Sequence, residues 1–167
     1  MKEFDYKLDY KKLNFRKPEI RKLYRIGRGE QGVLLVRPYT NFICTFWRFK
    51  TLPEAELSAK RIHEIYMWYR MKKDFIGMDM CRKFLEMGFT RARRYANHKS
   101  GKKYKDGKIL PQEKDWATSE KAKSATIFKR YRDLVATDKV YISMRKNWRE
   151  FENANNNIQK SETLWEI

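Results

Sequence analysis

The sequence is poor in the residues that build metal centres and disulfide-linked frameworks. Its 167 residues include only two cysteines, Cys44 and Cys81, and two histidines, His63 and His98. Neither pair has the spacing of a metal site, and no carboxylate cluster accompanies them. We therefore expect no metal, no cofactor and two unpaired thiols. Unpaired thiols are typical of a protein from a reducing compartment.

Long apolar runs are also missing. Residues 33–36 form one of the longest runs, which is far short of the roughly 20 apolar residues that a membrane-spanning helix needs. The first five residues, MKEFD, lack the apolar core of a secretory signal. We therefore expect no membrane attachment and no secretion. The expected location is intracellular, in the cytoplasm or nucleus of a host, or within a virion.

Positive charge dominates what is present. The chain has 39 lysines and arginines against 21 aspartates and glutamates, a formal net charge of +18. The hydrophobic fraction is 41% and the aromatic fraction 15%, which is enough for one sizeable core. An excess of charge of this size destabilises a compact chain unless an anionic partner offsets it. The composition therefore predicts a nucleic acid (DNA or RNA) or an anionic assembly surface as partner.

The order of the chain suggests three parts: a basic aromatic arm at 1–28, a core domain at 29–152 and a polar tail at 153–167. In the arm, Tyr6, Leu8 and Tyr10 alternate with charged residues, as in a short strand. We expect an extended arm that lays its aromatic side chains on the core and that can also contact neighbouring proteins. The Asn-rich tail is expected to be frayed.

The core is expected to contain a β-hairpin over 33–49 with its turn at 38–41, followed by about four helices. One helix is predicted over 51–72 and a second from about 75, capped by Asp74. Thr118 or Ser119 would cap the third, and Thr137 or Asp138 the fourth. The fold class is therefore α+β, in a single small domain. Gly77 and Gly88 share the inward face of the second helix, which indicates close approach of another backbone; a helix break near Gly88 is the alternative.

A glycine motif precedes the predicted hairpin. Gly27, Arg28, Gly29 and Gly32 match G-x-G-x-x-G. A dinucleotide site needs this motif after a strand and at the start of a helix, but here it comes before a predicted strand. The kinase motifs that accompany a similar loop are absent. We interpret the motif as a tight turn whose backbone N–H groups can contact a phosphate oxygen.

The most informative segment is 91–108, which contains eight basic residues and a single acidic one, Asp106. On a helix, Arg91, Arg94 and His98 would be neighbours. Guanidinium, ammonium and amide donors suit phosphates and base edges. The alternative is a solvated basic face. The predicted nucleic-acid or phosphate-binding residues are Arg91, Arg93, Arg94, Asn97, His98, Lys99, Lys102, Lys103 and Tyr104.

Three stretches carry a resemblance to a known family: residues 77–104, 23–34 and 47–51. They resemble the domain-of-unknown-function family number 4385, and the likeness covers about 4–150. Such proteins occur in tailed phages, bacteria, algae and large DNA viruses. The resemblance implies a viral or related protein. It supplies no activity and no catalytic residues, and it implies only that 91–104 and 27–32 hold the special residues of the fold.

Three functions follow as hypotheses. The first is a basic nucleic-acid-binding protein that contacts the phosphate backbone with little sequence specificity. The second is a structural component of a virion or ribonucleoprotein assembly, in which the arm orders on binding. The third is an enzyme on a phosphate-containing substrate, which would need the glycine turn and Arg91–His98 to converge on one pocket. Binding is the expected role rather than catalysis.

Overall fold

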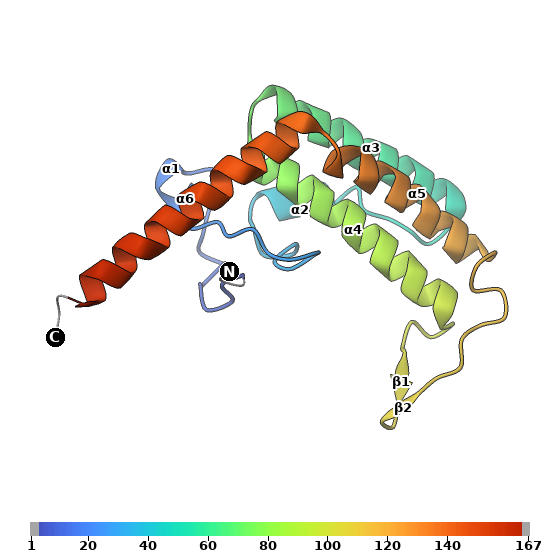
Figure 1. Ribbon diagram of the computed structural model, residues 1–167. Helices are drawn as coiled ribbons and strands as arrows, with labels where there is room; N and C mark the ends of the chain where they lie inside the picture. The colour runs from blue at the N-terminus through green and yellow to red at the C-terminus, as the bar shows by residue number, and fades with distance from the viewer. Residues whose placement is uncertain (1–3, 165–167) are drawn as a thin grey trace.

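Three long helices form the body of the protein (Figure 1). The computed structural model describes residues 4–164, with side chains as far as Asn155. The helices α3 (Leu52–Met71), α4 (Phe75–Asn97) and α5 (Glu120–Ala136) lie side by side, and α6 (Lys139–Leu164) crosses the start of α4. The described residues also include two short helices, α1 (Pro18–Arg21) and α2 (Tyr39–Cys44), and one two-stranded sheet. The chain is thus a mostly helical single domain, α+β in the broad sense.

Local capping sets where the long helices begin. The Thr51 hydroxyl accepts from the Glu54 amide at 3.4 Å, and the Glu54 carboxylate accepts from the Thr51 amide at 2.9 Å. Asp74 caps α4 and Ser119 caps α5, each accepting from the amide three residues later. Such caps satisfy amides that have no partner within the helix. The predicted starts of these three helices are confirmed, with Ser119 as the cap of α5.

The central helix α4 is buried on most of its circumference. It runs unbroken past Gly88, so the predicted alternative of a break there is wrong. A Cβ on Gly77 would lie 2.4 Å from the Tyr69 ring, and one on Gly88 would lie 2.3 Å from the Phe128 ring. The two glycines therefore admit aromatic rings of α3 and α5, and not another backbone as we expected.

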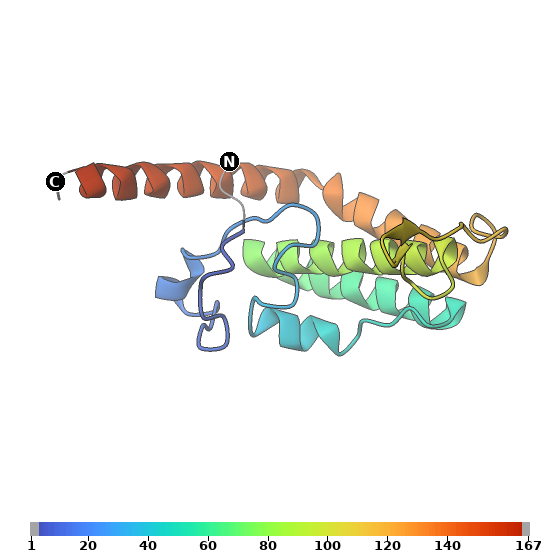
Figure 2. The same ribbon diagram turned by 90° about the horizontal axis from the view of Figure 1, so that it is seen from below.

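The N-terminal residues pack into the same core through their aromatic side chains. Phe4, Tyr10, Phe15 and Tyr24 are all buried, while the lysines of this segment stay in water. The expected strand-like stretch around Tyr6 is wrong, because these residues form turns that lead into α1. The segment lies below α6 and beside α4 (Figure 2).

The hairpin predicted over 33–49 is wrong. Residues 33–38 form turns, and α2 follows where the hairpin turn was expected. Val36, Tyr39 and Ile43 are all fully buried and recur at steps of three and four. That spacing places them on one helical face, so a period of 3.6 residues and not 2 describes this segment.

The sheet lies instead between α4 and α5, where we predicted no strand. Strand β1 (Tyr104–Lys105) pairs antiparallel with β2 (Lys108–Ile109). The two residues between the strands, Asp106 and Gly107, have φ angles of 50° and 76°. Positive φ at both positions is the requirement of a two-residue hairpin turn, for which Asp-Gly is a preferred pair.

Two further expectations concern the cysteines and the tail. Cys44, on α2, and Cys81, on α4, are unpaired, as predicted. The expected frayed tail is wrong within the described residues, because α6 continues through Leu164 and extends beyond the body (Figures 1 and 2).

Candidate anion-binding groove

The glycine motif forms a tight turn at the surface, as predicted. Gly29 and Gly32 have φ angles of 56° and 76°, a region that side chains disfavour. Gly32 also has no room for a side chain, because a Cβ there would lie 2.2 Å from the Phe4 ring. Among the described hydrogen bonds, the amides of Gly29 and Glu30 find no acceptor. Of the two residues, Gly29 is exposed at the surface of the turn.

A buried lysine from α4 supports this turn from inside. The Lys83 ammonium donates to the carbonyl oxygens of Gly27 at 3.1 Å and Gln31 at 2.7 Å. Its side chain is fully buried. Burial, assisted by the charges of Arg82 and Arg149, lowers the pKa of Lys83 to about 8 against the opposing effect of Asp79. Lys83 thus fixes the turn at the cost of desolvating its own charge.

A buried carboxylate anchors the neighbouring arginine. Asp79 is fully buried and accepts from the hydroxyls of Tyr141 (2.6 Å) and Tyr24 and from Nε of Arg82 (3.0 Å). Burial alone would raise the pKa of Asp79, but the charges of Arg82 and Lys83 and the two hydroxyls hold that pKa below its usual value. Burial and the Asp79 charge raise the pKa of both tyrosines. Asp79 therefore stays ionised, and Arg82 stays charged and oriented.

The turn, α4 and α6 together enclose a groove of about 690 Å³. Helix α6 is held against the turn by Arg149, which donates to the Ile26 carbonyl at 2.8 Å, and by the buried Glu152, which accepts from the Ile26 amide at 2.7 Å. Among the described residues, no carboxylate lines the groove. Its basic residues are Arg28, Arg82, Arg145, Lys146 and Arg149.

These five cations differ in how far they are already neutralised. Arg82 pairs with Asp79 and Arg149 pairs with Glu152, at 3.0 and 2.7 Å. Arg28, Arg145 and Lys146 make no ion pair with any residue that the structure describes. Together with the unpaired amide of Gly29, they give the groove the kinds of donor that an anion site would need.

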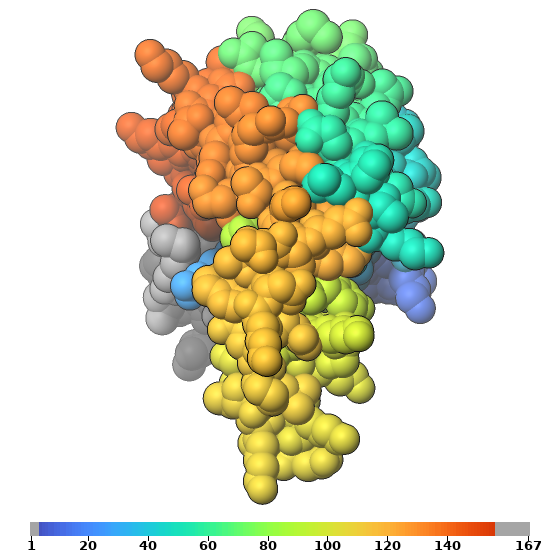
Figure 3. Space-filling view, turned by 90° about the vertical axis from the view of Figure 1, so that its right-hand side faces the viewer, coloured from blue at the N-terminus to red at the C-terminus, as the bar shows by residue number. Residues whose placement is uncertain are grey.

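The predicted basic segment lies elsewhere, at the far end of α4 and on a projecting tip (Figure 3). We define the tip as residues 99–109. Arg94, Lys99, Lys102, Lys103 and Tyr104 are exposed, as a surface for binding requires. The Lys103 ammonium lies 5.5 Å from the centre of the Tyr104 ring.

The other predicted residues of that segment contact the protein itself. The Arg93 guanidinium stacks on Trp116 at 4.8 Å and donates to its carbonyl at 3.1 Å. His98 Nδ1 lies 3.2 Å from the Pro111 carbonyl, and the Asn97 side chain accepts from Gln112. Arg91 is half-buried, and its Nε has no described partner. Arg93, Asn97 and His98 therefore hold the loop after the tip.

The glycine turn and the basic segment do not share a cavity. Gly27, Arg28 and Gly29 line the groove, whereas none of 91–104 does, and Gly32 is buried away from it. His98 lines a separate hollow of about 220 Å³ that also contains Glu113. Sixteen residues of helix separate Arg82 from His98, which corresponds to about 24 Å.

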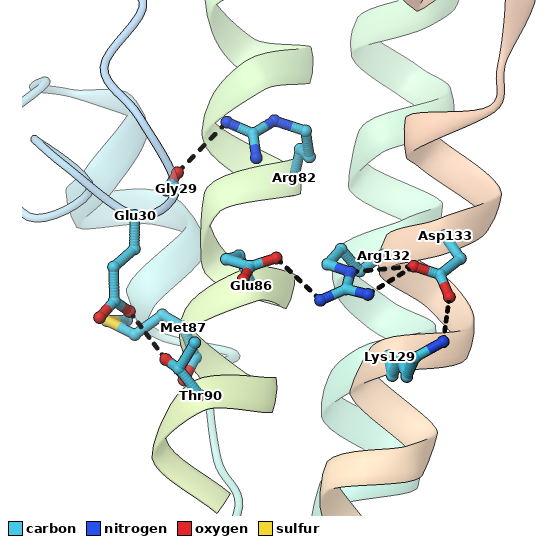
Figure 4. A network of polar contacts seen from close by, with 9 residues as sticks. All are labelled: Gly29, Glu30, Arg82, Glu86, Met87, Thr90, Lys129, Arg132 and Asp133. Carbon is cyan, nitrogen blue, oxygen red and sulfur yellow. Dashed lines mark hydrogen bonds and ion pairs between the residues drawn. The ribbon is translucent and has the colours of Figure 1, made fainter. Parts of the chain in front are cut away.

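A polar network lies between these two basic surfaces (Figure 4). Arg132 of α5 reaches Glu86 of α4 at 3.1 Å and Asp133 at 2.7 Å, and Lys129 reaches Asp133 at 2.7 Å. The two cations and two carboxylates balance. On the other side of α4, Thr90 donates to Glu30 of the glycine turn at 3.1 Å (Figure 4). The basic surfaces are therefore separated by this balanced network and by the Glu30 carboxylate, which forms no ion pair with a described residue.

The sequence reasoning missed most of the groove. Tyr141, Arg145 and Arg149 recur at steps of four, which places them on one helical face, and this was the available signal. Asp79 and Lys83 carried no signal, because a charged residue at an inward helical position is recognisable only once its partners are known.

The lowered pKa of Lys83 predicts how the free energy of unfolding depends on pH. The unfolded lysine keeps its proton up to a pH of about 10.4, whereas the folded one loses it near 8. Between these values the unfolded state binds more protons, so the free energy of unfolding rises with pH. Relative to Lys83→Met, the wild type should gain about 1 kcal/mol from pH ~7 to pH ~9 in urea titrations.

The subtraction cancels the contributions of Cys81 and the tyrosines, which both proteins share. The exposed Lys60, changed to Met, is the control for the loss of one positive charge. A difference between wild type and Lys83→Met that does not change with pH would contradict the lowered pKa.

Comparison with known proteins identifies one family. The family described as Domain of unknown function (DUF4385) matches residues 5–151. No curated protein and no solved structure matches the chain. Within the described residues, no helix is long and apolar enough to cross a membrane, and no cluster of three or more histidine, cysteine or acidic residues could hold a metal ion.

Proposed function

The chain belongs to the DUF4385 family, and because this family's description names no activity, we propose a function from the surface of the chain itself: it binds the phosphate backbone of nucleic acid with little sequence preference. The observation that carries the proposal is the groove between the glycine turn and α6. Of the residues that the structure describes, five basic ones and no carboxylate line it. Guanidinium groups and open backbone amides are the donors that recur at phosphate sites.

The inner part of the groove is prepared for a ligand before it arrives. Asp79 and the two tyrosine hydroxyls hold Arg82, and Lys83 holds the turn. Arg145 and Lys146, in contrast, are exposed and lack partners among the described residues. When Arg145 and Lys146 pair with phosphates of a nucleic acid, they replace the counterions condensed on it, and the release of those ions favours binding.

The tip supplies a second contact. It lies about 24 Å from the groove along α4, a length that corresponds to about seven base pairs of duplex. Because the network between the two surfaces is neutral, one backbone can pass from the groove to the tip without strong repulsion in between. Arg94, Lys99, Lys102 and Lys103 would contact it there.

This arrangement favours positioning over sequence reading. The candidate contacts are lysines, arginines and backbone amides. Contacts of this kind to phosphate fix the orientation of a protein but carry no sequence information. Related affinities for unrelated sequences are therefore expected.

The proposal is tested by binding of a labelled oligonucleotide, measured by fluorescence anisotropy. The double variant Arg145→Gln/Lys146→Gln should weaken binding by about tenfold or more at ~0.15 M salt, because two phosphate contacts are lost. The control Lys11→Gln/Lys60→Gln removes the same charge from exposed positions outside the groove and the tip, and should change affinity little. Equal effects of the two double variants would show that only net charge matters.

A role in a virion or ribonucleoprotein assembly is the second candidate, which the projecting end of α6 favours (Figures 1 and 2). Purification without nuclease separates the two. A high ratio of absorbance at 260 nm to that at 280 nm, lost after nuclease treatment, supports nucleic-acid binding. A protein partner that remains after nuclease treatment supports the assembly role.

A further inference from the structure

A second hollow lies on a different face of α4, beside the base of the tip. It has a volume of about 510 Å³, within the usual range of small-molecule sites. Three aromatic side chains line it, Trp47, Phe49 and Tyr95. We call it the aromatic hollow. None of these residues belongs to the groove proposed above to bind phosphate.

The three rings form a continuous wall. The centres of the Trp47 and Phe49 rings are 4.9 Å apart, and those of Phe49 and Tyr95 are 6.0 Å apart. Tyr95 is 40% exposed, unlike the tyrosines of the core. Its ring is held from behind by Gly101, where a Cβ would approach within 2.7 Å. The wall is thus open to solvent but fixed in position.

Cations surround this wall. Arg48, Lys50 and Lys121 also line the hollow, and no carboxylate in the described part of the chain does. Lys121 is already used, since it donates to the Phe49 carbonyl at 2.9 Å and lies 5.4 Å from the Phe49 ring centre. Lys50 is exposed and forms no ion pair with a described residue. The exposed Arg94 directly precedes Tyr95 in α4.

Another exposed aromatic hollow provides a comparison for this combination of aromatic side chains and cations. The hollow of about 460 Å³ beside Trp68 and Phe42 is also lined by aromatic side chains. Its lining includes the carboxylate of Glu64 beside Arg61, with which it forms an ion pair at 2.9 Å. Its lining also includes Arg16, so the Trp68 hollow has one cation in excess, against three in the aromatic hollow.

We propose that the aromatic hollow holds an unstacked base of a single-stranded nucleic acid, while the adjoining phosphates lie on Lys50, Arg94 and the tip. Every base has a flat face that can stack on an aromatic side chain, and a positively charged border suits the backbone that carries it. In a duplex the faces of the bases are already stacked on one another. The inference rests on the proposed function and adds a preference for single strands.

The experiment compares two labelled single strands of equal length and charge at one salt concentration, one of thymidylate and one of abasic sites. The wild type should bind the thymidylate strand about tenfold more tightly, since stacking of a base requires the base. Tyr95→Leu keeps apolar contact with Gly101 but removes the ring. It should abolish that difference and leave the affinity for the abasic strand unchanged. Trp68→Leu, the control from the other hollow, should retain the difference.

The outcomes separate this inference from the function on which it rests. Equal affinity of the wild type for both strands would overturn the base site and leave phosphate binding in place. Absence of binding to either strand would overturn both. Thermal unfolding of each variant verifies that it is folded. If Tyr95→Leu does not fold, the affinities of the wild type for the thymidylate and abasic strands still test the base site.

Discussion

Replacement of Asp79 with Asn is expected to lower the free energy of unfolding by about 3–5 kcal/mol. The Asp79 carboxylate is fully buried and accepts from Tyr24, Tyr141 and Arg82. Asn keeps the size of the side chain but removes its charge and one of its acceptor oxygens. The Arg82 guanidinium, only 13% exposed, would then lack its counter-charge. Thermal unfolding should show a decrease in the melting temperature of about 10 °C.

The same carboxylate gives the wild type an acid-sensitive contribution. Because the pKa of Asp79 is lower in the folded than in the unfolded protein, its stabilisation is complete above pH ~4 and is lost as the pH falls further. Asp79→Asn should lack this part of the pH dependence. The control is Glu64→Gln, because the ion pair of Glu64 with Arg61 is about half exposed. Its loss should lower the free energy of unfolding by less than about 1 kcal/mol. Equal effects of the two variants would contradict the role of the buried network.

Binding of duplex nucleic acid is expected to weaken steeply with salt. Seven exposed or unpaired cations are available, and the slope of log K against log salt is about −0.9 for each phosphate contact. With both basic surfaces engaged, we expect a slope of about −5 to −6. The seven residues are Arg28, Arg145 and Lys146 in the groove and Arg94, Lys99, Lys102 and Lys103 at the tip.

Two double variants test the two surfaces separately. Arg145→Gln/Lys146→Gln and Lys102→Gln/Lys103→Gln should each reduce the steepness of the slope by about two contacts, and their effects should add because the sites are far apart. Arg91 is not used for this test because it is half-buried. A slope near zero, or slopes that neither pair changes, would favour the assembly role over nucleic-acid binding.

The elements that were predicted correctly are those whose signals are local. Thr51 with Glu54, Asp74 and Ser119 each satisfy helix amides within three residues of their own position, so the starts of α3, α4 and α5 could be read directly. The turn at Gly29 and Gly32 was predictable for the same reason, since it depends on backbone conformations that glycine favours.

The incorrect predictions concern short segments whose residues fit two local structures. Residues 33–49 fit either a strand or a helix, and Asp106–Gly107 fits either a hairpin turn or a loop. Residues 33–49 contain β-branched and aromatic residues, which favour a strand, but burial of Val36, Tyr39 and Ile43 decides for a helix. The Asp106–Gly107 pair is typical of a hairpin turn, but we did not interpret it as one and so did not predict the sheet. In both cases the choice depends on what packs against the segment.

The sequence by itself determined the ends of the long helices, the free thiols and the excess of positive charge, because each follows from residue type or from neighbours within one or two turns. Only the tertiary structure decided where that charge becomes a site. Arg28, Arg82 and Arg145 are far apart in the chain and meet because α6 packs on α4 and on the N-terminal segment. The centre of the Trp148 ring lies 5.2 Å from that of Phe75, and the Trp148 indole donates a hydrogen bond to the Tyr24 carbonyl at 3.2 Å. Such contacts depend on how three distant surfaces fit together, and no local pattern of residues specifies that fit.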